Sequence, residues 1–178
     1  MEIEPNDNAL DADYIGEVFP GDRVEIEGHI TECCPDAYDG FAFYAGGPVE
    51  LVVTLFEDAA GADLDFCIYD PGIDAVVACW ETDAHPETGV FNFAGGAEFH
   101  VVVRSYLGDS SYLLRMDVNA LPAGTVFAAT QGPSAEAQRR FAGYSGEALE
   151  PEVVQVDAER LLLVEGLQEA QVLGGAGR

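Results

Sequence analysis

Basic residues are scarce in this chain of 178 residues, and lysine is absent altogether. Seven arginines stand against 33 acidic residues, which gives a formal net charge of −26 at pH 7. Binding to nucleic acids or to anionic membranes requires clustered positive charge, so this composition excludes both kinds of partner. Residues 1–120 hold 25 acids and three arginines, whereas residues 121–178 hold eight acids and four arginines. The excess negative charge therefore belongs to the first segment, where bound cations, high salt or a cationic partner must offset it.

Long apolar runs are also missing. No segment approaches the ~20 residues that span a bilayer, and no signal peptide is visible at the N-terminus. We expect Met1 to stand where a leader was removed, which places the mature protein outside the cell. The hydrophobic content of 48% excludes an acidic disordered chain and supports a folded domain with an appendage.

Cysteines are few, and no pair has the CxxC spacing typical of a zinc site or a redox motif. The four are Cys33, Cys34, Cys67 and Cys79. Their even number favours disulfides and an oxidising compartment. A hairpin centred near Ile73 would bring Cys67 opposite Cys79, but crossed pairings with the other two cysteines fit the sequence equally well. A zinc site is the weaker alternative, because the three histidines are scattered.

Short apolar segments broken by glycine, proline and aspartate run from residue 14 to residue 119. We expect eight strands, at Arg23–Ile30, Phe41–Tyr44, Val49–Phe56, Leu64–Tyr69, Ala75–Trp80, Gly89–Phe93, Phe99–Arg104 and Tyr112–Val118. Turn signals such as Asp70-Pro71-Gly72 separate them. Strands at this spacing predict an all-β domain over residues 1–120, an antiparallel, jelly-roll-like β-sandwich.

The pattern changes in the C-terminal extension, residues 121–178. Residues 134–142 predict a short helix with Ser134 as its N-cap. Residues 153–156 and 160–164 fit two strands, whereas 157–173 fits one amphipathic helix equally well. So few residues seldom form an independent core. We therefore expect the extension to pack on the sandwich or on a neighbouring chain, which would make the protein a homo-oligomer.

Acidic and amide side chains gather at the N-terminus and before the second expected strand. Glu2, Glu4, Asn6 and Asp7 stand in one extended segment, and Asp36 and Asp39 stand in a later loop. Alternate side chains of an extended segment share one side. Ca²⁺ takes six to eight oxygen ligands of these types. The pattern suggests a calcium site, and the alternative is a solvated N-terminal arm.

Several motifs in order resemble the bacterial pre-peptidase C-terminal (PPC) domain family, which is related to the collagen-binding domains of clostridial collagenases. The matching segments are Glu4-Pro-Asn-Asp7, Gly28-His-Ile30, Asp39-Gly-Phe-Ala-Phe43, Ala62–Asp70, Glu98–Val103 and Tyr112-Leu-Leu114. The resemblance covers residues 2–119 and not the extension. It implies a secreted β-sandwich that accompanies hydrolases or surface proteins and does no chemistry itself.

The resemblance also implies a ligand set. In calcium-binding members the N-terminal acids and an acidic loop hold the metal together, which maps to Glu2, Glu4, Asn6, Asp7, Asp36 and Asp39. Ala37 departs from the family pattern, in which an acid often stands at that position, so that Asp36 is displaced by one. We expect Asp63 and Asp65 to be structural, one capping a turn and the other facing solvent.

Signatures of catalysis are absent. Ser145 lies in Gly143-Tyr-Ser-Gly-Glu147, which lacks the last glycine of a nucleophile elbow. The chain holds no HExxH, phosphate-binding loop or dinucleotide fingerprint. We interpret the protein as a non-enzyme, with Tyr106 as a candidate exposed contact residue.

Two functions fit these observations. The leading hypothesis is a secreted, calcium-stabilised accessory module that attaches to an extracellular polymer or protein. The alternative is a structural subunit of an extracellular assembly, joined by strand addition and calcium bridges.

Overall fold

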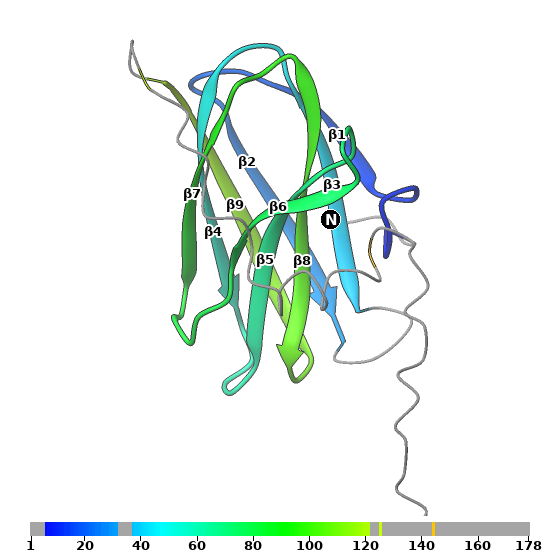
Figure 1. Ribbon diagram of the computed structural model, residues 1–178. Helices are drawn as coiled ribbons and strands as arrows, with labels where there is room; N and C mark the ends of the chain where they lie inside the picture. Colours follow the sequence, from blue (N-terminus) through cyan, green and yellow to red (C-terminus); the bar gives the residue numbers. More distant parts are fainter. Residues whose placement is uncertain (1–5, 32–36, 122–124, 126–143, 145–178) are drawn as a thin grey trace, which may run out of the picture. The chain divides into compact units, whose positions relative to one another are not determined.

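The computed structural model describes residues 6–31, 37–121, 125 and 144, and its regular elements are all β-strands. The nine strands are β1 (Asp13–Val18), β2 (Arg23–Ile30), β3 (Tyr38–Ala45), β4 (Val49–Glu57), β5 (Asp63–Asp70), β6 (Ala75–Trp80), β7 (Glu87–Phe93), β8 (Ala97–Leu107) and β9 (Ser110–Ala120). The first sheet has the order β1-β3-β8-β5-β6 and the second has the order β2-β9-β4-β7 (Figure 1). The predicted all-β sandwich is confirmed. No helix among these residues is long and apolar enough to cross a bilayer.

The main core lies between the two sheets. Alternate side chains of each strand point into it, since successive residues of a strand face opposite ways. Phe43 stacks on Phe99 with ring centroids 5.5 Å apart, and Phe66 stacks on Trp80 at 4.9 Å. All eight expected strands are present, with bounds that differ by a few residues.

Strand β1 was not among the expected strands. It pairs with β3 in parallel and forms one edge of the first sheet. Gly16 interrupts it, with a φ of +136° and a register shift between Tyr14 and Gly16. A glycine inside a short segment without alternation hides a strand from sequence patterns.

A second, smaller apolar cluster covers the outer face of the first sheet. It consists of Cys67, Tyr69, Val102 and Tyr144, with Ala9, Tyr38, Val76 and Cys79 at its margin. Cys67 on β5 and Cys79 on β6 are register partners and form a disulfide. The hairpin pairing is therefore confirmed over the crossed alternatives. Cys33 and Cys34 lie outside the described residues.

The chain divides into two compact units, Met1–Ala148 and Leu149–Arg178. In the extension, the described residues are Leu121, Thr125 and Tyr144. Tyr144 is fully buried on the first sheet, so the extension contacts the sandwich at this residue. The expected helix at 134–142 and the expected elements after residue 152 lie outside the described residues.

Candidate calcium site and surface groove

The N-terminal segment meets the beginning of β3 at two of the expected ligands. The Gly40 backbone N–H donates a hydrogen bond to the Asn6 carbonyl, with an N–O distance of 3.0 Å. Asp39 precedes Gly40 and alternates in phase with Phe41 and Phe43, so its side chain faces the interior. Asn6 and Asp39 are both fully buried. The structure thus brings the Asn6 and Asp39 segments together.

Asp39 has a partner from the second sheet. The Tyr112 hydroxyl on β9 donates a hydrogen bond to Asp39 Oδ2. Tyr112 is itself buried, in phase with Leu114 and the main core. A carboxylate at the interior edge of a sandwich requires such donors or a cation, because burial of an isolated charge is costly.

Asn6 is the buried polar side chain in this region whose hydrogen-bonding atoms are least satisfied. Its Oδ1 and Nδ2 atoms are both buried, and neither has a hydrogen-bond partner within the described part of the chain. A buried amide without partners costs on the order of 1–3 kcal/mol, so native proteins almost always satisfy it. The Asn6 side chain therefore marks a place where a further group belongs.

The donor chemistry around Asn6 fits a hard cation. The amide oxygen of Asn6 and the carboxylates of Asp7 and Asp39 are ligand types that Ca²⁺ prefers. Among the described residues no three His, Cys, Asp or Glu side chains stand together in a metal-holding group. The other expected ligands, Glu2, Glu4 and Asp36, lie outside the described residues. A complete shell would therefore need oxygens from that part of the chain or from water.

The two aspartates on β5, Asp63 and Asp65, have register partners on β8. Asp65 is buried, and its register partner on the neighbouring strand is Arg104. The guanidinium carbon of Arg104 lies 5.5 Å from the ring centroid of Tyr38. Asp65 is almost fully buried, whereas Asp63 is half-buried and keeps part of its surface exposed. On the outer face of the first sheet, Asp65 of β5 therefore lies beside Arg104 of β8.

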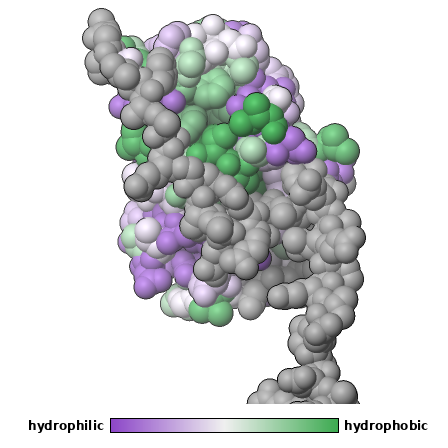
Figure 2. Space-filling model, in the orientation of Figure 1, coloured by the Kyte–Doolittle hydropathy of each residue, from purple (hydrophilic) through white to green (hydrophobic). Residues whose placement is uncertain are grey.

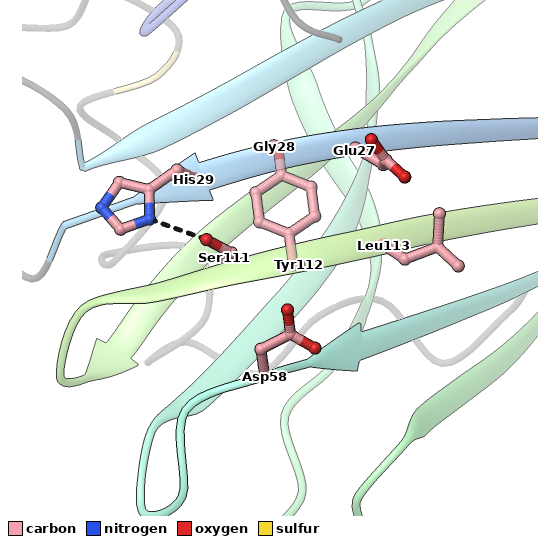
Figure 3. A pocket seen from close by; sticks show the side chains of 7 residues that line it. All are labelled: Glu27, Gly28, His29, Asp58, Ser111, Tyr112 and Leu113. Atoms are coloured by element: carbon pink, nitrogen blue, oxygen red, sulfur yellow. Dashed lines mark hydrogen bonds between the residues drawn. The ribbon is translucent and has the colours of Figure 1, made fainter.

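A shallow groove of about 620 Å³ opens at the end of the second sheet (Figure 3). Its lining residues are Glu27, Gly28, His29, Asp58, Ser111, Tyr112 and Leu113. His29 Nδ1 lies 3.2 Å from Ser111 Oγ. The loop after β4 is fixed beside it, because the Asp58 N–H donates to the Ser111 carbonyl at 3.0 Å. Sequence inspection missed this groove, which combines residues from two strands, β2 and β9, and from the loop after β4.

The groove places a histidine beside a serine, whereas the acid Asp58 of the same groove follows a strand two positions away in the sheet. In a catalytic triad the histidine bonds the serine through one nitrogen and an acid through the other. Here His29 is on β2 and Asp58 follows β4, which lies on the far side of β9. Glu27 and Asp58 make the lining negative, and it contains no arginine, so anionic ligands are disfavoured. Ser145, the other serine considered, lies outside the described residues.

A buried histidine on β8 was also missed by sequence inspection. His100 Nδ1 lies 2.8 Å from the Tyr144 hydroxyl, and its Nε2 lies 3.1 Å from Glu98 Oε1. A carboxylate only accepts, so Nε2 carries the proton and Nδ1 accepts from Tyr144. Burial lowers the pKa of His100, and Glu98 partly opposes that effect. Burial raises the pKa of Tyr144, which remains a neutral donor. This hydrogen bond connects Tyr144 to β8 on the outer face of the first sheet.

A buried carboxylate also lies at the beginning of β7. Glu87 is almost fully buried, and its Oε1 accepts a hydrogen bond from the Thr82 N–H at 2.8 Å. Burial raises the pKa of Glu87, and the negative charges of Asp63 and Glu81 add to this effect. Hydrogen bonds from Thr82 oppose this shift. Tyr106, by contrast, is half-exposed, as expected for a contact residue.

The fold and these sites define a β-sandwich with an anchored N-terminal segment. The sequence matches no protein-family model and no curated protein. Among solved structures, the chain is similar to the pre-peptidase C-terminal domain of the collagenase of Bacillus anthracis. The identity is 16% and the TM-score 0.48, over 61% of this chain and 94% of that domain. This structure bears the name of the family that the sequence motifs resemble.

Two further solved structures have similar folds. PliG of Salmonella Typhimurium, a periplasmic inhibitor of g-type lysozyme, has 13% identity and a TM-score of 0.40, with 61% of this chain and 99% of that chain covered. The mitogen of Yersinia pseudotuberculosis has 14% identity and a TM-score of 0.42, with 59% and 92% covered. At these identities the likeness concerns the fold.

Proposed function

We propose that this chain is a secreted, non-catalytic β-sandwich accessory module, stabilised by Ca²⁺ bound between its N-terminal segment and the beginning of β3. The observation that carries the proposal is the Asn6 amide, which is fully buried and has no hydrogen-bond partner within the described residues. It adjoins the buried Asp39 segment through the bond from Gly40. An oxygen-binding cation would satisfy the amide oxygen and offset the buried carboxylate.

The protein residues have separate tasks in this proposal. Asp39 holds its carboxylate inside the sandwich, where Tyr112 orients one oxygen. Asn6 is placed by its backbone bond to Gly40, and Asp7 follows it directly. Glu2, Glu4 and Asp36 are the proposed remaining ligands. Calcium would supply positive charge at this point and would tie the N-terminal segment to the sandwich.

An extracellular location suits the same molecule. The disulfide between Cys67 and Cys79 is typical of proteins exported to an oxidising compartment. The groove enters this proposal as a surface for attachment or support. The proposed partner is an extracellular polymer or protein to which the module attaches.

Thermal unfolding of the chelated full chain, with and without 2 mM CaCl₂, tests the calcium site. A ligand that binds only the folded state stabilises it by about 2.7 kcal/mol at a hundred times its Kd, which is several degrees in Tm. We expect Asn6→Ala and Asp39→Asn to abolish most of the calcium-induced shift. Both variants also change basal stability, so the calcium-induced shift is the measurement.

Asp58→Asn is the matched control, because it removes one exposed carboxylate elsewhere and should leave the shift unchanged. An unchanged Tm in the parent chain, together with no heat in a calcium titration, would remove calcium from the proposal. A shift of equal size with MgCl₂ would point to general charge screening, since Mg²⁺ fits such protein cages poorly.

A further inference from the structure

Exposed apolar side chains concentrate at one edge of the first sheet. The large exposed hydrophobic residues of the described chain are Leu10, Tyr14, Ile15, Phe19, Tyr44, Ile73, Val90, Tyr106 and Leu107. Four of these nine fall within residues 10–19, and a fifth, Tyr44, is the residue opposite Glu17 in the neighbouring strand. We name residues 10–19 together with Tyr44 the β1 edge. On the face shown in Figure 2, apolar surface gathers toward the end at which β1 is labelled in Figure 1.

The backbone of the β1 edge is arranged for a further strand. β1 is the outermost strand of the first sheet, and within the described residues it pairs only with β3. The outer side of an edge strand presents N–H and C=O groups that another strand can pair with. Leu10, which is 94% exposed, stands in a turn fixed by the Asn8 side chain, whose Oδ1 accepts from the Leu10 N–H at 2.9 Å. An exposed leucine held in a fixed turn gives a partner a preformed contact.

The charge of the β1 edge selects the partner. Asp11 and Glu17 are exposed within it, and the sequence holds no basic residue before Arg23. Acids on an edge strand prevent two copies from pairing, because like charges would meet. The proposed calcium site would offset only a small part of the net charge of −26, so the surface stays strongly anionic. An extended segment with basic side chains is attracted where a second copy is repelled.

We propose that the β1 edge binds an extended segment of a basic partner protein by strand addition, in which apolar residues alternate with arginine or lysine. Backbone pairing with β1 supplies the docking, Tyr14, Ile15 and Tyr44 contact the apolar residues, and Glu17 pairs with a cation. This deepens the accessory function proposed above by naming the class of partner. It does not depend on calcium.

The test uses the isotope-labelled full chain and a twelve-residue peptide of alternating valine and arginine, followed by NMR in chelator and again in CaCl₂. We expect amide shifts at residues 10–19 in both buffers. Glu17→Arg and Ile15→Asp should each weaken binding about tenfold, which corresponds to ~1.4 kcal/mol. Their matched controls are Glu27→Arg on β2 and Val90→Asp on β7, two other edge strands with an exposed residue of the same type. Each control should change binding less than about twofold.

Four results would overturn the proposal. Equal weakening by Glu17→Arg and Glu27→Arg would reduce it to attraction by net charge, and equal binding of a valine–glutamate peptide would remove the selectivity for basic partners. Shifts at residues 10–19 that grow with protein concentration alone would make a second copy the occupant. Displacement of the basic peptide by a synthetic peptide of residues 149–178 would make this chain's own extension the occupant. If the basic peptide still binds in chelator, the β1-edge proposal holds even where the calcium proposal fails, so the two can be distinguished.

Discussion

The outer faces of the two sheets differ although both sheets enclose the same core. On the second sheet, β2, β4 and β9 alternate between buried and more exposed residues along their length. Ion pairs cross this face, with Arg23 Nε 2.6 Å from Asp117 Oδ1 and Arg115 Nε 2.8 Å from Glu25 Oε1. On the first sheet, β3, β5 and β8 have runs of at least five consecutive buried residues. Among the residues that the structure describes, the three strands β3, β5 and β8 are therefore buried on both faces, whereas β2, β4 and β9 are buried on one face and more exposed on the other.

This difference shows where the sandwich has room for added segments. The cover of the first sheet comes from Tyr144 and from Ala9, whose N–H donates to the Tyr144 carbonyl at 2.8 Å. Segments from both ends of the sandwich thus meet on this face. The second sheet carries exposed charge instead and keeps its face in water. Within the described part of the chain, both of these added segments therefore lie on the first sheet.

The largest predicted effect on stability comes from removing the side chain of Tyr144, which covers the outer face of the first sheet. Tyr144→Ala should lower the free energy of unfolding by ~3 kcal/mol, the cost of removing a fully buried aromatic side chain. Tyr144 packs edge-on against Tyr69, with ring centroids 5.3 Å apart, and this contact is lost as well. Urea denaturation measures the change. Tyr106→Ala, at a half-exposed tyrosine, is the control and should stay within about 0.5 kcal/mol of the parent. Equal effects of the two substitutions would show that Tyr144 does not contribute to the folded unit.

The second-largest predicted effect on stability concerns Gly40 on β3, which lies against the Tyr144 side chain. A Cβ atom at Gly40 would lie 2.1 Å from the Tyr144 hydroxyl oxygen, so Gly40→Ala should cost about 2 kcal/mol by overpacking. Gly47→Ala is the control, because its Cβ would meet no atom within 4 Å.

A double-mutant cycle sharpens this prediction. When Tyr144→Ala is already present, Gly40→Ala should cost almost nothing, since the colliding ring is gone. Additive losses in the double variant would mean that Gly40 is required for a reason other than the approach of Tyr144.

The sequence predicted eight of the nine strands and the packing of the extension on the sandwich or on a neighbouring chain, but neither β1 nor the residue by which the extension contacts the first sheet. Alternation in Arg23–Ile30 and continuous apolarity in Leu64–Tyr69 both indicate strands, and the spacing of Cys67 and Cys79 placed them opposite each other. The contact of Tyr144 with the first sheet could not be predicted in this way. Tyr144 and His100 are 44 positions apart, and a contact over that distance produces no periodic pattern in the sequence. Of the six expected calcium ligands, Asn6 and Asp39 are brought into neighbouring segments; the signal for Asn6 was the N-terminal motif, and the signal for Asp39 was the acidic loop before the expected strand at Phe41–Tyr44.

A smaller effect should appear as pH dependence on the covered face. Burial lowers the pKa of His100 in the folded protein below 6.5, so the unfolded chain takes up a proton first. Stability should therefore fall as the pH drops from about 6.5 to the lowered folded pKa, and level off below it. The charged and titratable groups that face the ring are Glu98, Tyr69 and Tyr144. Urea denaturation between pH 7.5 and 5 should show a decline that His100→Gln removes. A decline of the same size in the variant would assign it to other groups.

The smallest effect belongs to the uncovered face of the second sheet. Glu25→Gln removes the ion pair with Arg115, but both partners are partly exposed to water, where such a pair contributes only about 0.2–1 kcal/mol. Arg115 also lies over the Phe56 ring, 5.2 Å from its centroid, and this contact survives the substitution. We expect a loss below about 0.5 kcal/mol that disappears in 1 M NaCl, where exposed charges are screened within ~3 Å. Urea denaturation at low and high salt provides the measurement. A salt-independent loss above about 1 kcal/mol would mean that this face is covered in the folded protein, and the contrast between the two sheets would no longer hold.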